Sequence, residues 1–150
     1  MVSHTDGILV SRTELIVSEA KKMAELPLAT AEVCDANSHL ITSGQGQGRV
    51  LVVDGGSSLR CAILGGNLAQ LAQNNGWAGI VVNACIRDVD EIDGCDVGVR
   101  ALGSHPMKSN KKGMGEKHAP VALAGTRVCD GEWLYADADG ILVSRTELIV

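Results

Sequence analysis

Two apolar runs in the middle of the chain give the clearest secondary-structure signal. RVLVVDGG, residues 49–56, is an almost continuous β-branched run that stops at turn residues, as is typical of a strand covered on both faces. WAGIVVNACIRD, residues 77–88, shows the same pattern. Between them, NLAQLAQNNG places Leu68, Leu71 and Ala72 on one face of a helix that Gly76 caps. A strand, a helix and a strand in this order predict a parallel pair joined by a right-handed crossover.

Weaker patterns extend this unit in both directions. TAEVCDANSHLI, residues 30–41, has a helical spacing that begins at Thr30 and ends before Gly44. SGQGQG, residues 43–48, predicts a short flexible joint. Downstream, VGVRAL (97–102) and VALAGTRV (121–128) predict further strands, with a long loop over residues 105–120 between them. Because helices and strands alternate, the predicted fold class is α/β.

One segment, DGILVSRTELIV, occurs identically at residues 6–17 and 139–150. Nothing else repeats, so a solenoid of equal units is excluded. Each copy predicts a strand or a bent strand pair. We therefore divide the chain into an appended copy with a polar linker, residues 1–22, and a domain over residues 23–150 whose last strand is the second copy. The first copy can either compete with residues 139–150 for one strand position or cover an exposed edge of the sheet.

Composition narrows the class of protein. A chain of 150 residues is long enough for one domain with its own core. Its net charge of -5 and the lack of a Lys/Arg stripe argue against a nucleic-acid partner, and the basic cluster around Lys108 is interpreted as a solvated loop. No apolar run reaches the roughly 18 residues that cross a bilayer, and the N-terminus is no signal peptide, so we expect a cytosolic protein without a membrane partner. The cysteines form no C-x-x-C pair, which predicts reduced thiols packed as small core residues.

A glycine pair begins the central helix. Gly65 and Gly66 directly precede its first turn, Asn67 and Leu68, where a ligand could approach the free amides at the positive helix end. Such a site favours a carboxylate or a phosphate. A tight strand-to-helix turn without a ligand is the competing interpretation. The G-x-G-x-x-G and G-K-[ST] patterns of nucleotide-binding loops are absent.

Charged residues follow the second buried strand. Arg87 and Asp88 stand at its carboxyl end, where open α/β sheets bind their ligands. Arg87 can hold a substrate oxygen, and Asp88 can hold a divalent cation directly or through water. The competing interpretation is a surface ion pair followed by an acidic loop. Asp54, at the end of the neighbouring strand, either assists this site or stabilises a turn.

Several of these segments together resemble one known family. AEVCDAN, GRVLVVDGG, AILGGNLAQLAQNNGWAGIVVN, CIRDVDEI and GEWLYADADGILVS are similar to the family of the regulator of ribonuclease activity A, most of all to its plant members, the 4-hydroxy-4-methyl-2-oxoglutarate aldolases. The resemblance extends from Met23 to Val150. It implies a swivelling β/β/α fold and a homotrimer with active sites between subunits. It also implies a class II aldolase that uses a divalent cation, Mg²⁺ or Mn²⁺, cleaves a small 2-oxo acid to two pyruvates and decarboxylates oxaloacetate in a side reaction.

The resemblance also implies the roles of individual residues. The substrate-binding loop falls on Gly65, Gly66, Asn67 and Leu68, the catalytic and substrate-binding arginine on Arg87, and the catalytic, metal-binding aspartate on Asp88. A cation and Arg87 together stabilise the negative charge that develops on the pyruvyl C2 oxygen as the carbon–carbon bond breaks.

The chain departs from the family pattern at three places. Ser57 replaces a third glycine and Ala84 a common one, and a positive φ at either would cost about 1 kcal/mol. Near residues 44–48, several tens of residues of the family are missing, together with most of its phenylalanines, which explains why the chain has no Phe. The alternatives to an active aldolase are a regulator that binds and inhibits a ribonuclease without catalysis, and an inactive member of the family.

Overall fold

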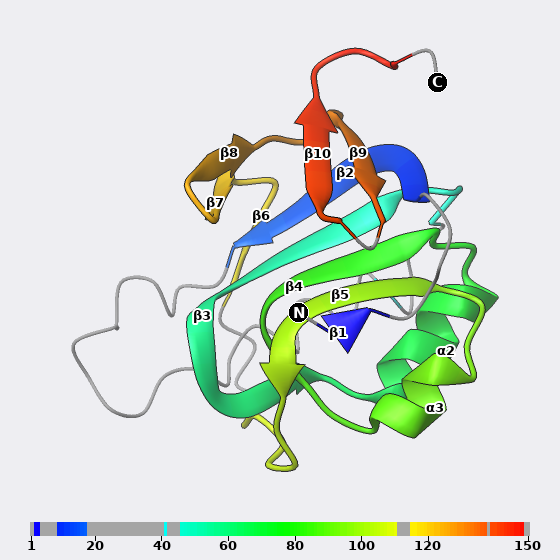
Figure 1. The fold of residues 1–150 in the computed structure, drawn as a ribbon, viewed down its shortest axis with the longest axis vertical. Coiled ribbons are helices and arrows are strands. Elements are labelled where there is room, and N and C mark those ends of the chain that lie inside the picture. The colour runs from blue at the N-terminus through cyan, green and yellow to red at the C-terminus, as the bar shows by residue number, and fades with distance from the viewer. Residues whose placement is uncertain are drawn as a thin grey trace.

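A computed structural model of the chain describes residues 2–3, 9–17, 41, 46–110, 115–137 and 139–148 (Figure 1). The linker that follows the first copy lies outside these residues. So does the helix predicted from Thr30, apart from Ile41, which is helical and buried. The domain boundary between residues 22 and 23 and the shortening near residues 44–48 therefore stay predictions.

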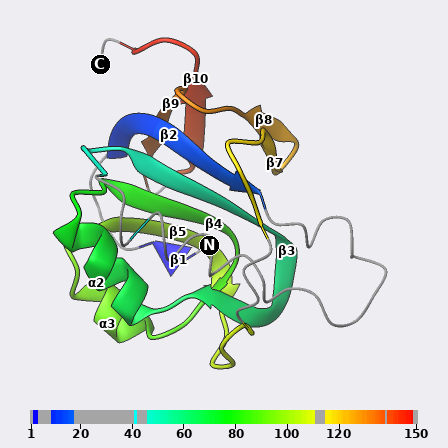
Figure 2. The same cartoon turned by 180° about the vertical axis from the view of Figure 1, so that it is seen from behind.

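The predicted strand–helix–strand unit is present. β3 (Val50–Leu64) and β4 (Gly79–Ile86) pair in parallel, and α2 (Gly66–Asn74) connects them. The short helix α3 (Val89–Asp93) follows β4 and leads to β5 (Gly98–Ser104), which extends the parallel sheet. α2 and α3 cover the same face of this sheet (Figures 1 and 2).

β3 differs from its prediction. We expected the strand to stop at Asp54, but it continues through the glycines and is 15 residues long. It bends there, because its register against β4 shifts between Asp54 and Leu64, and Gly56 and Ser57 take left-handed φ values of 66° and 59°. The turn residues therefore form a bulged bend inside one strand. Beyond the bend the chain pairs with β4 again, where its side chains are buried.

In the part of the chain that the structure describes, the remaining strands complete an eight-stranded sheet and a separate hairpin. The sheet order is β1-β5-β4-β3-β2-β9-β10, with β6 paired to β2. The bounds of these added strands are Val2–Ser3 for β1, Leu9–Val17 for β2, Glu116–Lys117 for β6, Trp133–Ala136 for β9 and Ile141–Ser144 for β10. The segment VALAGTRV forms the hairpin of β7 (Val121–Leu123) and β8 (Thr126–Val128), which turns at Ala124 and Gly125.

The two copies of the repeated segment lie on opposite sides of β9. In the first copy, β2 pairs with β9 through residues 9–12 and with β3, in parallel, through residues 13–17. In the second copy, β10 pairs with β9 and ends the strand order. Leu9 faces Ala136, whereas its counterpart Leu142 faces Tyr135, so the two registers differ by one residue. The first copy therefore covers the edges of β3 and β9, and the two copies do not occupy the same position.

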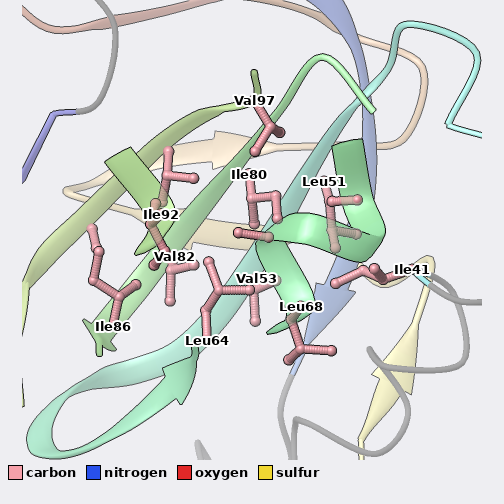
Figure 3. Close-up of a cluster of buried hydrophobic side chains, with 14 of the residues drawn as sticks. Ile41, Leu51, Val53, Leu64, Leu68, Ile80, Val82, Ile86, Ile92 and Val97 are labelled. Carbon is pink, nitrogen blue, oxygen red and sulfur yellow. The ribbon is translucent and has the colours of Figure 1, made fainter. Parts of the chain in front are cut away.

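Apolar side chains pack on both faces of the parallel strands. Leu51 and Val53 of β3 point into a core beneath the helices, while Val50 and Val52 join a second core on the opposite face. Figure 3 shows the first core, which includes Leu68, Ile80, Val82, Ile86 and Ile92. This two-sided burial confirms the interpretation of the β-branched runs and the α/β fold class. Within the described residues, no helix combines the length and the apolar character that crossing a membrane requires.

The described part of the predicted flexible joint is held in place. The Gly46 amide donates to the Asn75 carbonyl, and the Gly48 amide donates to the Gly76 carbonyl, each at 2.8 Å. A Cβ atom on Gly46 would lie 2.6 Å from the Cα atom of Trp77, so a side chain does not fit there. The backbone leading into β3 is thus anchored against the end of α2, which helps to fix where β3 begins.

Candidate functional site

A small pocket opens where β3 and β4 end. Its volume is about 70 Å³. The sequence-predicted residues that line it are Gly65, Asn67, Leu68, Arg87 and Asp88, and it is also lined by the end of β3 and by Lys108 and Ser109. Of the predicted set, Gly66 does not line the pocket. The structure thus brings together residues from three separate segments of the chain.

Arg87 and Asp88 form an ion pair at the pocket. The Arg87 amide donates to the Leu64 carbonyl at 2.9 Å, which ties the end of β4 to the end of β3. The Arg87 Nε atom lies 3.4 Å from Asp88 Oδ2, and each side chain is 33% exposed. Asp88 has a left-handed φ of 57°, which is uncommon outside glycine but is adopted by Asp more readily than by most residues. The structure therefore shows the ion pair of the competing interpretation and places it at a pocket, and the binding roles of Arg87 and Asp88 stay predictions.

The glycine pair lets the start of α2 approach Arg87 and Asp88. A Cβ atom on Gly65 would lie 2.9 Å from Asp88 Oδ2 and 3.1 Å from Arg87 Nε. A Cβ atom on Gly66 would collide with Glu91, whose own Cβ atom would be 2.8 Å away. At both positions a side chain would clash with its neighbours, so close packing by itself explains the two glycines, as the tight-turn interpretation requires.

The amides at the start of α2 are partly used within the chain. The Gly66 amide donates to Asp88 Oδ2 at 3.3 Å, and the Leu68 amide donates to the Gly65 carbonyl at 3.0 Å. The Asn67 amide has no hydrogen-bond partner among the described residues. It therefore remains available at the positive end of the helix to bind an anionic group.

Lys108 and Ser109 were not among the predicted site residues. The Ala62 amide donates to the Met107 carbonyl at 2.8 Å, and the Ser109 amide donates to the Ala62 carbonyl at 3.0 Å. These bonds attach the loop after β5 to β3 and bring Lys108 to the pocket. Lys108 is exposed, as we expected of a solvated loop, but that interpretation missed its position at the pocket. No local pattern marks this residue, because its place depends on pairing between distant segments.

Asp54 stabilises the bend of β3. Its carboxylate is buried, and Oδ1 accepts hydrogen bonds from the Gly56 amide at 2.9 Å and from Asn83 Nδ2 at 2.8 Å. It does not line the pocket. Of the two roles considered for Asp54, the structure shows the turn role.

The described cysteines are free thiols, and Cys61, Cys85 and Cys95 are buried, as predicted. Burial raises the pKa of the Cys85 thiol, and the nearby Cys61 raises it further. A neutral thiol is a poor nucleophile, so Cys85 is unsuited to covalent catalysis although it lies just before Arg87. Within the described residues, no group of three or more His, Cys, Asp and Glu side chains could hold a metal ion.

Comparison with known proteins gives consistent matches. The family model RraA-like, described as "Aldolase/RraA", matches residues 16–143. The protein named "Putative 4-hydroxy-4-methyl-2-oxoglutarate aldolase 2" of Arabidopsis thaliana is 57% identical over 163 residues, covering 82% of this chain and 98% of the relative. A protein of the same name, without the number, from Burkholderia mallei is 58% identical over 125 residues, covering 82% of this chain and 76% of the relative. The plant alignment is longer than this chain of 150 residues, so the relative holds residues in the matched region that this chain lacks.

A solved structure also matches the fold. The RNA-processing inhibitor RraA of Thermus thermophilus has a TM-score of 0.81 and 35% sequence identity. The match covers 96% of this chain and 80% of that one. The pocket described above lies within the segment that the family model matches. Sequence and fold agree, and the chain belongs to the RraA-like family.

Proposed function

We propose that this chain is a divalent-metal-dependent aldolase that cleaves 4-hydroxy-4-methyl-2-oxoglutarate to two pyruvates. One observation carries the proposal: Arg87, Asp88 and the start of α2 converge on one pocket. The names of relatives that are 57% and 58% identical support it. This pocket combines the Arg87 guanidinium, the Asp88 carboxylate and the free Asn67 amide. It suits a 2-oxo acid, because such a substrate presents a carboxylate beside a polarisable carbonyl.

The donor set suits Mg²⁺ or Mn²⁺. Both contacts of the Asp88 carboxylate use Oδ2, and no described residue bonds to Oδ1. Mg²⁺ is commonly held by one or two carboxylates, with water and substrate oxygens as its other ligands, so Asp88 can serve as its protein ligand. A structural zinc site would need four protein ligands. When bound, the cation would polarise the 2-oxo group and lower the pKa of a coordinated water, which could then take the substrate hydroxyl proton.

The residues of this chain can orient the substrate and stabilise the charge that develops. The C3–C4 bond breaks, and its electron pair becomes the C2=C3 bond of a pyruvate enolate with its charge on the C2 oxygen. The C4 oxygen, having lost its proton, becomes the carbonyl of the second pyruvate, and a proton added at C3 completes the first. Arg87 stabilises the charge on the C2 oxygen as it develops. The Asn67 amide holds the adjacent carboxylate and aligns the bond that breaks.

Substitution of Asp88 tests the proposal. We expect the purified chain to release pyruvate from 4-hydroxy-4-methyl-2-oxoglutarate in the presence of Mg²⁺. This release should stop when EDTA is added. Asp88→Asn should lower kcat/KM on the order of 100-fold or more, because it removes the charge that holds the cation. Asparagine tolerates the left-handed backbone at this position better than alanine does.

Asp90→Asn is the matched control, since Asp90 is an exposed carboxylate of the adjacent helix and does not line the pocket. It should retain parental activity. Metal-dependent turnover that survives in Asp88→Asn would refute the role of Asp88, and absence of turnover in the parent chain would refute the aldolase.

Three finer properties belong to the same proposal. Oxaloacetate decarboxylation would pass through the same enolate after loss of CO₂, so Asp88→Asn should abolish both reactions together. The homotrimer is proposed from the family resemblance. The cytosolic location is proposed from the sequence, in which we identified neither a membrane-spanning apolar run nor a signal peptide. The alternative, inhibition of a ribonuclease, is suggested by the family resemblance and by the name of the Thermus thermophilus relative, an RNA-processing inhibitor. It is distinguished by Asp88→Asn, because binding to a ribonuclease does not need the metal ligand.

A further inference from the structure

The loop after β5 holds Lys108 at a fixed place beside the pocket. Backbone hydrogen bonds on both sides of Lys108, from Ala62 to Met107 and from Ser109 to Ala62, form a parallel bridge to β3. The loop is anchored further by the His105 amide, which donates to the Ile86 carbonyl at 2.8 Å. Ser109 is buried. The base of the Lys108 side chain is therefore positioned by the sheet, while its long stem remains adjustable.

Lys108 and Arg87 approach the pocket from opposite sides of β3. Ala62 is bridged to Lys108 on one side and paired with Cys85 of β4 on the other, and Arg87 follows at the end of β4. Neighbouring strands are about 4.8 Å apart, so the backbones that carry the two cations are separated by roughly 10 Å. Both side chains line the pocket at the end of β3. Two cationic side chains that reach one pocket from opposite sides of a strand can bind the two ends of one small molecule.

The charges of the pocket suit an anion with two negative groups. Among the residues that the structure describes, the charged ones that line it are Arg87, Lys108 and Asp88. Asp88 is paired with Arg87, whereas Lys108 forms no ion pair with any residue that the structure describes. A pocket lysine that is not paired with a described carboxylate of the protein can bind a carboxylate of a ligand through a charge-assisted hydrogen bond.

We infer that Lys108 is a specificity-determining residue that binds the second carboxylate of a dicarboxylic 2-oxo acid. The inference rests on the proposed function, which places the 2-oxo acid end of the substrate at Arg87, Asp88 and the start of α2. Lys108 then binds the carboxylate at the far end. A monocarboxylic 2-oxo acid fills the first set of contacts and leaves Lys108 without a partner. The pocket therefore selects substrates by the presence of the second carboxylate.

Binding of two non-cleavable probes tests the inference. The full chain with Mg²⁺ is titrated calorimetrically with 2-oxoglutarate, which has two carboxylates, and with 2-oxobutyrate, which has one. Lys108→Met should weaken 2-oxoglutarate binding on the order of tenfold, as expected for loss of a hydrogen bond to a charged group, and leave 2-oxobutyrate binding unchanged. Lys108→Arg should keep most of the affinity for 2-oxoglutarate that Lys108→Met loses. Lys117→Met, an exposed lysine of β6 that does not line the pocket, should change neither affinity.

Kinetics separates this role from a structural one. Because the contact is the same in the bound substrate and in the transition state, Lys108→Met should raise KM for 4-hydroxy-4-methyl-2-oxoglutarate and leave kcat near its parental value. Equal weakening of both probes, or failure of the parent to prefer 2-oxoglutarate, overturns the inference. If the parent binds 2-oxoglutarate through Lys108 and yet releases no pyruvate, the proposed aldolase fails while the carboxylate site stands.

Discussion

Ser57 holds a left-handed backbone conformation at the bend of β3, with φ of 59°. An L-residue pays about 1 kcal/mol or more for this conformation, which glycine adopts freely. The serine hydroxyl donates to Asn83 Oδ1 at 3.1 Å, at an exposed position that limits the gain. Ala84, where the family resemblance also implies a glycine, is not among the described residues with positive φ. The two substitutions therefore have different physical consequences.

We expect Ser57→Gly to be more stable than Ser57→Ala by about 1 kcal/mol. Both variants lose the hydroxyl, so their difference isolates the backbone strain. Ala84→Gly is the matched control and should be destabilising, because it removes a buried methyl group from a strand without relieving any strain. Urea unfolding measured by circular dichroism gives the free energies. Equal stability of the glycine and alanine variants at position 57 would contradict the argument.

At the scale of elements, β2 joins the two halves of the sheet. It pairs with β3 through its second half and with β9 through its first half. Without it, both of these strands would expose unpaired backbone groups, which promote aggregation. An identical sequence occurs at residues 139–150, and within its described part, residues 139–148, only Ile141–Ser144 form a strand. The same twelve residues thus provide a comparison in which sequence is constant and position differs.

Proline substitution at matching positions of the two copies tests the role of β2. Glu14→Pro should lower the free energy of unfolding by about 1–3 kcal/mol, because proline does not fit a strand that pairs with β3 and β9. Its counterpart Glu147→Pro should have little effect, since Glu147 is exposed and lies beyond β10. Deleting residues 1–22 should also lower the free energy of unfolding, and it should increase aggregation. Unfolding curves and size-exclusion chromatography measure both effects. Equal stability of the two proline variants would show that the first copy contributes nothing.

At the scale of the whole molecule, the pocket of one chain encloses only the pyruvyl end of a substrate, so the far carboxylate would lie at its rim, where Lys108 is exposed. Its volume of about 70 Å³ has room for roughly five water-sized groups, enough for a pyruvyl end. Two large apolar side chains are exposed on the segments that form it: Leu59 of β3 is 60% exposed and Met107 is 62% exposed. An adjoining subunit that covers these side chains would also enlarge and enclose the site, in agreement with the trimer that the family resemblance implies.

We therefore expect light scattering to give a molar mass three times that of the chain, which is 15.6 kDa. Leu59→Glu or Met107→Glu should shift the mass toward that of one chain and lower activity in parallel, because a charge placed in an apolar contact is costly. Leu142→Glu is the control, since Leu142 is 56% exposed but lies on the edge strand β10, away from the pocket. A monomeric parent chain with full activity would contradict the prediction.

Local patterns predicted much of the central unit. The β-branched runs marked β3 and β4 because strands buried on both faces must be apolar throughout, and Leu68 and Ala72 marked the buried face of α2. Arg87 and Asp88 were indicated because ligands bind at the carboxyl ends of parallel strands, and Gly65 because it directly precedes the start of a helix; all three line the pocket. The bend at Gly56 and Ser57 was mistaken for the end of a strand, since turn residues are the same in a loop and in a bulge.

The sequence by itself determined the properties that depend on neighbouring residues: which segments are strands, where α2 begins and ends, and which charged residues follow β4. Tertiary structure decided the rest, because strand pairing joins segments that no local pattern connects. It placed Lys108 beside Ala62 and gave the two identical copies different neighbours in the sheet. Identical residues take different roles here because a strand is completed by the partners whose backbone groups it pairs with.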